Sequence, residues 1–234
     1  MDCRQLVFVS MLVIAITSHA SSDDTSSKVS MSLYYEALCP YCANFIVNDL
    51  QKILTTDLLS ILNLRLVPWG NAAFKDDKTW ACQHGPDECL LDTVEACAIN
   101  VHDLGTHFRF IRCVERLNLE NRHTEWQSCF RTGGLNPKPI ADCYNTGLGF
   151  LLERRYADET ARLNPPHQYV PWVLVNNVPI GVDYRNFVAY VCKAYRGPSI
   201  PIACKSPLFD INSSEKKNTS SGVCYAGEMR EWHQ

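Results

Sequence analysis

A Cys-x-x-Cys pair placed between a strand-like and a helix-like segment is the feature that most restricts how this chain folds. Cys39-Pro40-Tyr41-Cys42 follows an apolar run over residues 29–37 that alternates as a strand does, and residues 43–59 carry apolar side chains at helical spacing. In this position the unpaired N–H groups at the start of the helix stabilise a thiolate on the first cysteine. The pattern predicts a redox-active dithiol in which Cys39 is the nucleophile and Cys42, one turn further along, resolves the intermediate.

Two alternatives to a redox pair are half of a zinc site and a pair of structural cysteines. Zinc normally takes four ligands in two close pairs. The nearest further candidates, Cys82, His84 and Cys89, stand about 40 positions downstream in a different element. The flanking strand and helix therefore favour the redox interpretation, and we expect no metal site.

Helical patterns fill a long stretch in the middle of the chain, about residues 80–164. Two helices are expected over residues 90–104 and 108–117, because apolar side chains recur there in steps of three and four. A short third helix capped by Thr124 and a fourth over residues 137–151 are expected to follow.

Strand-like segments flank this helical stretch. Residues 62–66 alternate between apolar and polar side chains, and residues 169–175 turn at Asn176-Asn177 into residues 178–182. A final helix follows, with Asp183 as its expected N-cap. This order predicts an α/β protein with a thioredoxin-like fold and a helical, disulfide-rich insertion between the second strand and the C-terminal hairpin.

Val170-Pro171-Trp172 opens the hairpin at the place where thioredoxin-like folds carry a cis-proline against the dithiol. A cis X-Pro bond costs only about 0.5–1 kcal/mol, and it would leave the Val170 backbone free to pair with an extended substrate beside Cys39. An ordinary trans proline at a strand start is the alternative. Val170 and Pro171, together with Pro40 and Tyr41 between the cysteines, are the expected substrate-contacting residues.

The N-terminal residues 1–20 predict a secretory signal peptide. Arg4 gives a basic start, residues 6–16 are apolar, and Ser18-His19-Ala20 is a small-x-small cleavage site. The apolar run is far shorter than the roughly 20 residues of a spanning helix. We therefore expect a soluble lumenal protein with no membrane anchor, which begins with a polar lead-in over residues 21–28. A net charge of −3 without a basic stripe argues against nucleic acid as a partner.

The C-terminal residues 205–234 are expected to form a polar, glycosylated tail. Asn212-Ser213-Ser214 and Asn218-Thr219-Ser220 are N-glycosylation acceptors in a secretory protein, unless they remain unused. The chain carries 12 cysteines, which is dense for 234 residues and indicates an oxidising compartment or metal. Cys3 leaves with the signal peptide, and the remaining number is odd. At least one cysteine must then stay free, pair between chains or belong to a cycling dithiol.

One further motif resembles a known family. The run Cys82-Gln83-His84-Gly85-Pro86-Asp87-Glu88-Cys89, followed by Asp92 and Cys97, resembles the signature C-Q-H-G-x-x-E-C-x-x-N-x-x-x-x-C of the gamma-interferon-inducible lysosomal thiol reductases. The resemblance includes the dithiol and the runs 67–72 and 165–172, and it covers about residues 29–204. Asp92 stands where the signature has Asn, which keeps the acceptor but loses the amide donor. We expect this change to affect the helical block and not the dithiol.

The signature residues are distant from the dithiol in sequence, so a structural role is expected for them. His84 is either a proton donor at acidic pH or, as we favour, a histidine hydrogen-bonded within its loop. Cys224, alone in the tail, is the candidate for the odd thiol or for a disulfide-linked dimer. Connectivity cannot be read from sequence, although Cys192 to Cys204 would be a short closure. The candidates for structural disulfides are Cys82, Cys89, Cys97, Cys113, Cys129, Cys143, Cys192 and Cys204.

The resemblance implies an enzyme that reduces disulfides of unfolded or partly unfolded proteins in an acidic endosomal, lysosomal or vacuolar lumen, or outside the cell. It needs no cofactor beyond the cysteine pair, but an external small thiol must restore the dithiol. A free cysteine with a pKa of about 8.5 has almost no thiolate in acid, so the pKa of Cys39 must be strongly lowered. The alternatives are a disulfide oxidase or isomerase of the secretory pathway and a secreted, disulfide-rich binding protein without catalysis.

Overall fold

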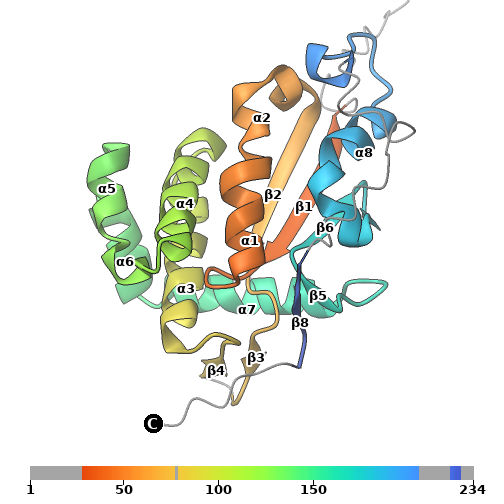
Figure 1. The fold of residues 1–234 in the computed structure, drawn as a ribbon. Coiled ribbons are helices and arrows are strands. Elements are labelled where there is room, and N and C mark those ends of the chain that lie inside the picture. Colours follow the sequence, from red (N-terminus) through yellow and green to blue (C-terminus); the bar gives the residue numbers. More distant parts are fainter. Residues whose placement is uncertain (1–27, 77–78, 206–221, 228–234) are drawn as a thin grey trace, which may run out of the picture.

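A four-stranded sheet with the strand order β2-β1-β6-β7 forms the centre of the protein (Figure 1). The computed structural model describes residues 28–76, 79–205 and 222–227. β1 (Val29–Tyr35) runs parallel to β2 (Leu62–Pro68) and antiparallel to β6 (Trp172–Val175), which pairs in turn with β7 (Val178–Pro179). A parallel pair needs a crossover connection and an antiparallel pair only a tight turn, so this sheet has the strand arrangement predicted from the order of the segments.

The crossover between β1 and β2 is a nearly continuous helical run that starts at the dithiol. It consists of α1 (Pro40–Asn44), the π-helical η2 (Phe45–Leu50) and α2 (Lys52–Thr55), and the 3-10 helix η3 (Asp57–Ile61) leads into β2. The helix predicted over residues 43–59 thus begins slightly earlier. It ends earlier too, because Thr56 is extended, with φ −131° and ψ 179°.

The hairpin turns as predicted, and both of its turn residues adopt the left-handed conformation. Asn176 has φ 47° and Asn177 has φ 63°, which matches the turn type that suits the twist of a hairpin. The strand predicted over residues 169–175 is interrupted at Pro171, which has no N–H for a ladder. Its first part, β5 (Tyr169–Val170), pairs outside the main sheet with β8 (Cys224–Tyr225).

The final helix is α8 (Phe187–Ala194), and the 3-10 helix η5 (Gly181–Asn186) precedes it. The prediction that Asp183 caps this helix is wrong, because Asp183 lies inside η5. Its carboxylate accepts hydrogen bonds from the Asn186 amide at 2.5 Å and from the Tyr190 hydroxyl at 2.9 Å.

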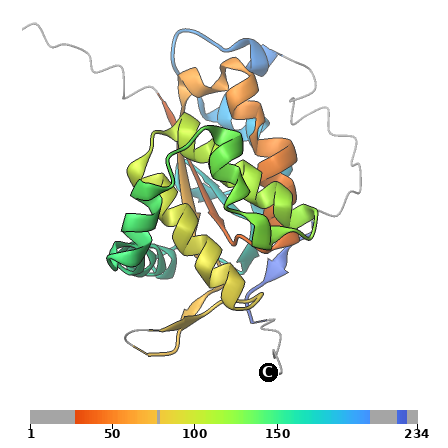
Figure 2. The ribbon, with the colours of Figure 1, turned by 90° about the vertical axis from the view of Figure 1, so that its left-hand side faces the viewer.

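The helical insertion covers one side of the sheet, and it faces the viewer in Figure 2. Its helices α3 and α7 pack against β2, while α4 packs against α1. A short hairpin of β3 (Ala73–Phe74) and β4 (Trp80–Ala81) comes first. The helices are α3 (Pro86–Val101), α4 (Leu104–Leu119), the 3-10 helix η4 (His123–Glu125), α5 (Ser128–Gly133), α6 (Lys138–Asn145) and α7 (Leu148–Ala161).

Two predictions within the insertion are wrong. Thr124 caps no helix, because it lies inside the 3-10 turn η4 and α5 starts only at Ser128. The helix predicted over residues 137–151 is two helices, α6 and α7, which meet at Gly147. Gly147 has φ 82°, a conformation that interrupts a right-handed helix and that glycine adopts without strain.

Four disulfides tie together the eight cysteines expected to be structural. Cys192 bonds to Cys204, which anchors the 3-10 helix η6 (Ile202–Lys205) to α8. The other three bonds lie in the insertion and its first loop: Cys82–Cys89, Cys97–Cys143 and Cys113–Cys129. Among the described residues, no helix is long and apolar enough to cross a membrane. The signal peptide, nearly all of the lead-in, and Asn212 and Asn218 lie outside the described residues.

Candidate active site

Cys39 is the N-cap residue of α1 and is fully buried. The next residue, Pro40, occupies the first turn, where a missing N–H costs the helix nothing. The Val170-Pro171 bond is cis, and the Val170 carbonyl oxygen lies 4.0 Å from the Cys39 sulfur. Pro40 and Tyr41 are exposed at the surface beside it. The structure thus brings together all the residues predicted to contact substrate.

Cys42 lies one turn into the helix and is the one unpaired cysteine among the described residues. Its side chain is fully buried. Burial, and then the nearby charge of Glu36, raise the pKa of the Cys42 thiol well above its usual value. In this state Cys42 is therefore a protonated thiol that is shielded from solvent.

Cys39 forms a disulfide with Cys224 and not with Cys42. The prediction that Cys224 is the odd thiol or joins two chains is therefore wrong for this structure. The cause is the pairing of β8 with β5, which sets Cys224 opposite Val170 and leaves the Cα atoms of Cys39 and Cys224 6.4 Å apart. Residues 222–227, which belong to the predicted polar tail, thus return to the dithiol.

The signature loop also lies at the dithiol, although about 40 residues separate them in sequence. The Cys82–Cys89 disulfide closes the loop, and Gly85 starts α3 with φ 99°. His84 Nδ1 lies 2.5 Å from Glu88 Oε2, and His84 Nε2 lies 3.8 Å from the Cys224 sulfur. His84 is therefore hydrogen-bonded as expected, but the expectation of a purely structural loop missed its contact with the Cys224 sulfur.

The loop after β2 completes this side of the site. Gly70 has φ 53°, and a Cβ at this position would collide with the Glu36 side chain. Glycine therefore lets the chain pass closely over Glu36, whose Oε1 accepts a hydrogen bond from the Asn71 backbone N–H at 2.6 Å. The Asn71 amide in turn donates to Gln83 Oε1 at 2.7 Å. Asn71, Gln83 and His84 thus form one wall beside Cys39 and Cys224.

Acidic side chains are buried around the segment that leads to the dithiol. The Tyr35 hydroxyl donates to Glu95 Oε2 at 2.6 Å, and the Ala37 N–H donates to Asp92 Oδ1 at 2.9 Å. Burial raises the pKa of Glu95 to about 8, although the Tyr35 hydrogen bond opposes this. Burial is also the main cause of the raised pKa of four further carboxyl groups, Glu36, Asp92, Glu115 and Glu153.

Asp92 contacts the segment that leads to the dithiol as well as lying in the helical block. Its acceptor oxygen holds the backbone two residues before Cys39, while its Oδ2 is buried without a hydrogen-bond partner. An amide at this position would keep the first contact without a titrating group. The position that departs from the family signature thus holds the backbone two residues before Cys39.

Side chains that could bind a metal also gather around the dithiol. The ligand atoms within each of three groups lie within 4.8 Å of one another: Glu36/His84/Glu88, Glu36/Cys39/Cys224 and Cys82/Glu88/Asp92. The sulfurs of Cys39, Cys224 and Cys82 are held in disulfides, and Nδ1 of His84 is hydrogen-bonded to Glu88. Because zinc binds thiolates and not disulfide sulfurs, the arrangement fits thiol–disulfide chemistry better than metal binding.

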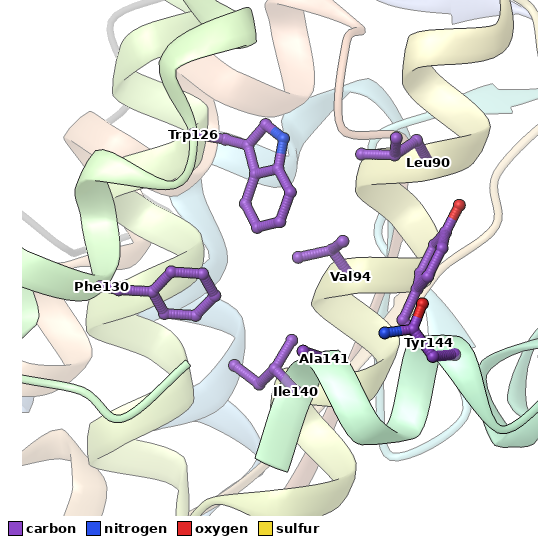
Figure 3. A pocket seen from close by; sticks show the side chains of 8 residues that line it. Leu90, Val94, Trp126, Phe130, Ile140, Ala141 and Tyr144 are labelled. Atoms are coloured by element: carbon purple, nitrogen blue, oxygen red, sulfur yellow. The ribbon is translucent and has the colours of Figure 1, made fainter. Parts of the chain in front are cut away.

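An apolar pocket of about 200 Å³ lies in the insertion (Figure 3). The side chains of Trp126 and Phe130 face Val94 and Ile140 across it. Apart from the Tyr144 hydroxyl and the Asn145 amide, its lining is apolar: Leu90, Val94, Trp126, Phe130, Ile140 and Ala141. It contains no pair of groups that would carry out acid–base or nucleophilic chemistry.

Solved structures share this arrangement of sheet, helices and insertion. The oxidised BdbD of Bacillus subtilis matches with a TM-score of 0.52 and 13% identity over 77% of this chain and 89% of that chain. The reduced disulfide bond oxidoreductase DsbG of Mycobacterium tuberculosis matches with a TM-score of 0.51 and 14% identity over 76% of this chain and 82% of that chain. These likenesses establish the thioredoxin-like fold.

Relatives found by sequence have a much higher identity to this chain. The gamma-interferon-responsive lysosomal thiol protein of Arabidopsis thaliana is 41% identical over 91% of each chain. The gamma-interferon-inducible lysosomal thiol reductase of Mus musculus is 36% identical over 86% of this chain and 77% of its own. The family model for gamma interferon inducible lysosomal thiol reductase matches residues 30–133, which contain both the dithiol and the signature loop. The chain belongs to the gamma-interferon-inducible lysosomal thiol reductase family.

Proposed function

We propose that this protein is a thiol–disulfide reductase that opens disulfides of unfolded proteins through Cys39 and Cys42. The observation that carries the proposal is the position of Cys39, which caps a helix and faces the cis-proline strand at Val170. Such a position stabilises a thiolate and leaves a backbone edge for an extended substrate. The name of the mouse relative, a thiol reductase, supports reduction as the direction of the reaction.

The reaction proceeds by two exchanges. The Cys39 thiolate attacks one sulfur of a substrate disulfide, and the other substrate sulfur leaves as a thiol. The Cys42 thiol, after losing its proton, attacks the Cys39 sulfur and releases the second substrate thiol, which leaves a Cys39–Cys42 disulfide. An external small thiol then reduces this disulfide and restores the dithiol.

We assign the reaction to an acidic lumen of the lysosomal or vacuolar type, reached through the secretory pathway. Two observations support this assignment. Both relatives are named as lysosomal proteins. In addition, burial raises the pKa of carboxyl groups around the site, such as Glu95 and Asp92. A fold that buries neutral carboxyl groups is favoured by acid, because alkaline solution charges them.

The test is reduction of a denatured, disulfide-bonded protein at pH near 5 with a small thiol as electron donor. Cys39→Ser should abolish activity, while Cys42→Ser should accumulate substrates linked to Cys39. The double variant Cys192→Ser/Cys204→Ser, which removes a disulfide outside the site, controls for loss of a cysteine pair. Full activity of Cys39→Ser would refute the assignment of the nucleophile. Activity only near neutral pH would refute the acidic lumen.

A further inference from the structure

The C-terminal segment 222–227 lies across the dithiol in the way that an extended substrate would. Figure 1 shows β8 beside β5, below the start of α1. Its strand pairs antiparallel with β5, so that Cys224 is opposite Val170 and Tyr225 is opposite Tyr169. The Cys224 sulfur is bonded to Cys39, the proposed nucleophile. This combination of a disulfide to Cys39 and a strand on the cis-proline edge is what the mixed disulfide with a substrate requires.

Protein side chains hold the backbone of this segment at three successive places. The Tyr184 hydroxyl donates to the Gly222 carbonyl at 2.8 Å, and the Asn71 amide donates to the Cys224 carbonyl at 3.1 Å. The Gln83 amide donates to the next carbonyl, that of Tyr225, at 2.8 Å. Gln83 is itself buried. The segment is therefore bound through peptide groups that any polypeptide carries.

The side chains of the segment contribute much less to its binding. Tyr225 is 50% exposed, and its ring meets the Tyr169 ring edge-on with centroids 5.8 Å apart. Gly222 lies against the Tyr41 ring, where a Cβ would overlap the ring. Recognition of backbone with little demand on side chains suits extended, unfolded segments of varied sequence, in which peptide groups are free to bond.

His84 is the ionisable group that faces the Cys224 sulfur from the signature loop. Its Nε2 points at this sulfur, and its Nδ1 is held by Glu88 at 2.5 Å, with Glu36 Oε2 at 3.5 Å. Glu88 and Glu36 both lie on the Nδ1 side of the ring, so they fix the ring with Nε2 toward Cys224. A proton on Nε2 is then directed at the sulfur that must leave when Cys42 attacks Cys39.

We propose that residues 222–227 are an internal substrate that occupies the binding site for an extended polypeptide around its reacting cysteine. In this site Asn71 and Gln83 bind the substrate backbone, and His84 protonates the departing sulfur. The inference rests on the proposed function and deepens it, because it assigns the residues that hold the substrate backbone and gives a catalytic task to the signature loop.

The exchange that frees the site balances without an external oxidant. Cys42 loses one proton, the same number that Cys224 gains, and its thiolate attacks the Cys39 sulfur. The Cys39–Cys42 bond forms as the Cys39–Cys224 bond breaks, and the electron pair leaves with the Cys224 sulfur, which takes a proton from His84. The number of disulfides is unchanged. A bound external substrate would release its thiol by the same step, and the internal segment competes with it for the site.

The first test measures occupancy in the full chain isolated at pH near 5 without reductant. Non-reducing peptide mapping should find Cys39 bonded to Cys224. When a small thiol donor is added, wild type should show a lag before reducing denatured protein, whereas Cys224→Ser should start at least about 10-fold sooner. Cys39 bonded wholly to Cys42 in the isolated protein, or equal lags for the two proteins, would overturn the internal-substrate proposal.

The second test compares a denatured disulfide-bonded protein with an aromatic disulfide such as dithiobis(nitrobenzoate), whose thiolate leaves without a proton. His84→Gln should lower kcat roughly 100-fold for the protein substrate and leave the aromatic disulfide nearly unaffected. Gln83→Leu should instead raise KM for the protein substrate by about 10-fold. His123→Gln is the matched control, since His123 pairs with Asp87 at the surface.

Retained activity on the aromatic disulfide also proves that each variant is folded. Equal losses on both substrates, or no loss with His84→Gln, would overturn the role of His84. These outcomes are separable from failure of the proposed function. If Cys39→Ser is inactive on both substrates while Cys224→Ser and His84→Gln behave as wild type, the reductase stands and this inference fails.

Discussion

Replacing Glu95 with glutamine should remove a measurable part of the pH dependence of stability. Glu95 is fully buried on α3, accepts a hydrogen bond from the Tyr35 hydroxyl and has a pKa raised to about 8. In the unfolded chain a glutamate has a pKa of about 4.3. The folded protein therefore holds a proton that the unfolded chain releases throughout the range between these two values.

Because of this difference in pKa, the free energy of unfolding falls as the pH rises. A carboxyl group whose pKa is raised by folding stabilises the fold fully below its unfolded pKa, and this contribution is lost as the pH rises toward the folded pKa. Each pH unit within the window changes the free energy of unfolding by about 1.4 kcal/mol. Between pH 5 and pH 7, Glu95 alone should therefore reduce it by about 2 to 3 kcal/mol.

The assay is urea denaturation, followed by tryptophan fluorescence, at pH 5, 6 and 7 in a Cys42→Ser background that prevents disulfide exchange by this thiol. Glu95→Gln keeps an acceptor for Tyr35 but places an amide at the Oε1 position, which lacks a partner. This lowers stability equally at every pH, so the slope with pH is the quantity to compare. Glu125→Gln is the matched control, because Glu125 is exposed and its hydrogen bond to Arg122 lowers its pKa.

The expected result is a wild-type free energy of unfolding that falls from pH 5 to pH 7, and a distinctly smaller fall in Glu95→Gln. Glu125→Gln should follow wild type. An unchanged slope in Glu95→Gln would show that Glu95 is ionised in the folded protein, and the argument from burial would then be refuted.

Two further outcomes are expected from the same denaturation experiment. Asp92→Asn, which restores the residue of the family signature, should lose less stability than wild type as the pH rises from 5 to 7, because burial raises the pKa of Asp92 and the amide oxygen still accepts from Ala37; an equal loss would contradict this. Replacing the Cys97–Cys143 pair by serines should cost about 4 kcal/mol and the Cys192–Cys204 pair about 3 kcal/mol, since the closed loops span 46 and 12 residues; a larger loss for the shorter loop would contradict the loop-entropy account.

Much of the fold was predictable because local patterns determine it. The alternation in β1, the helical spacing after Cys42 and the Asn176-Asn177 turn each use short-range rules that the structure obeys. The misplaced helix boundaries near Thr124 and Asp183 have a common cause. Both side chains lie within 3-10 turns, where capping residues are equally frequent and the sequence does not distinguish them.

The composition of the site was only half predictable. The residues adjacent in sequence identify the dithiol and the cis-proline. The contact of His84 with Cys224, in contrast, joins residues 140 positions apart that only the folded chain brings together. No periodicity reports such a contact. The odd number of cysteines left after removal of the predicted signal peptide was the one available signal, and it indicated an unpaired sulfur without showing which. The structure assigns that sulfur to Cys42.

The bond between Cys39 and Cys224 also joins positions 185 residues apart. A loop of that size restricts the unfolded chain and contributes at most about 5 kcal/mol to stability, whereas a loop closed by Cys39 and Cys42 contributes little. Moving the bond from Cys224 to Cys42 would therefore lower the stability of the whole domain, although only one disulfide partner changes. The melting temperature of this protein should therefore be higher when Cys39 is bonded to Cys224 than when it is bonded to Cys42. Resistance to unfolding, and hence to proteases, should change with each disulfide exchange at the site.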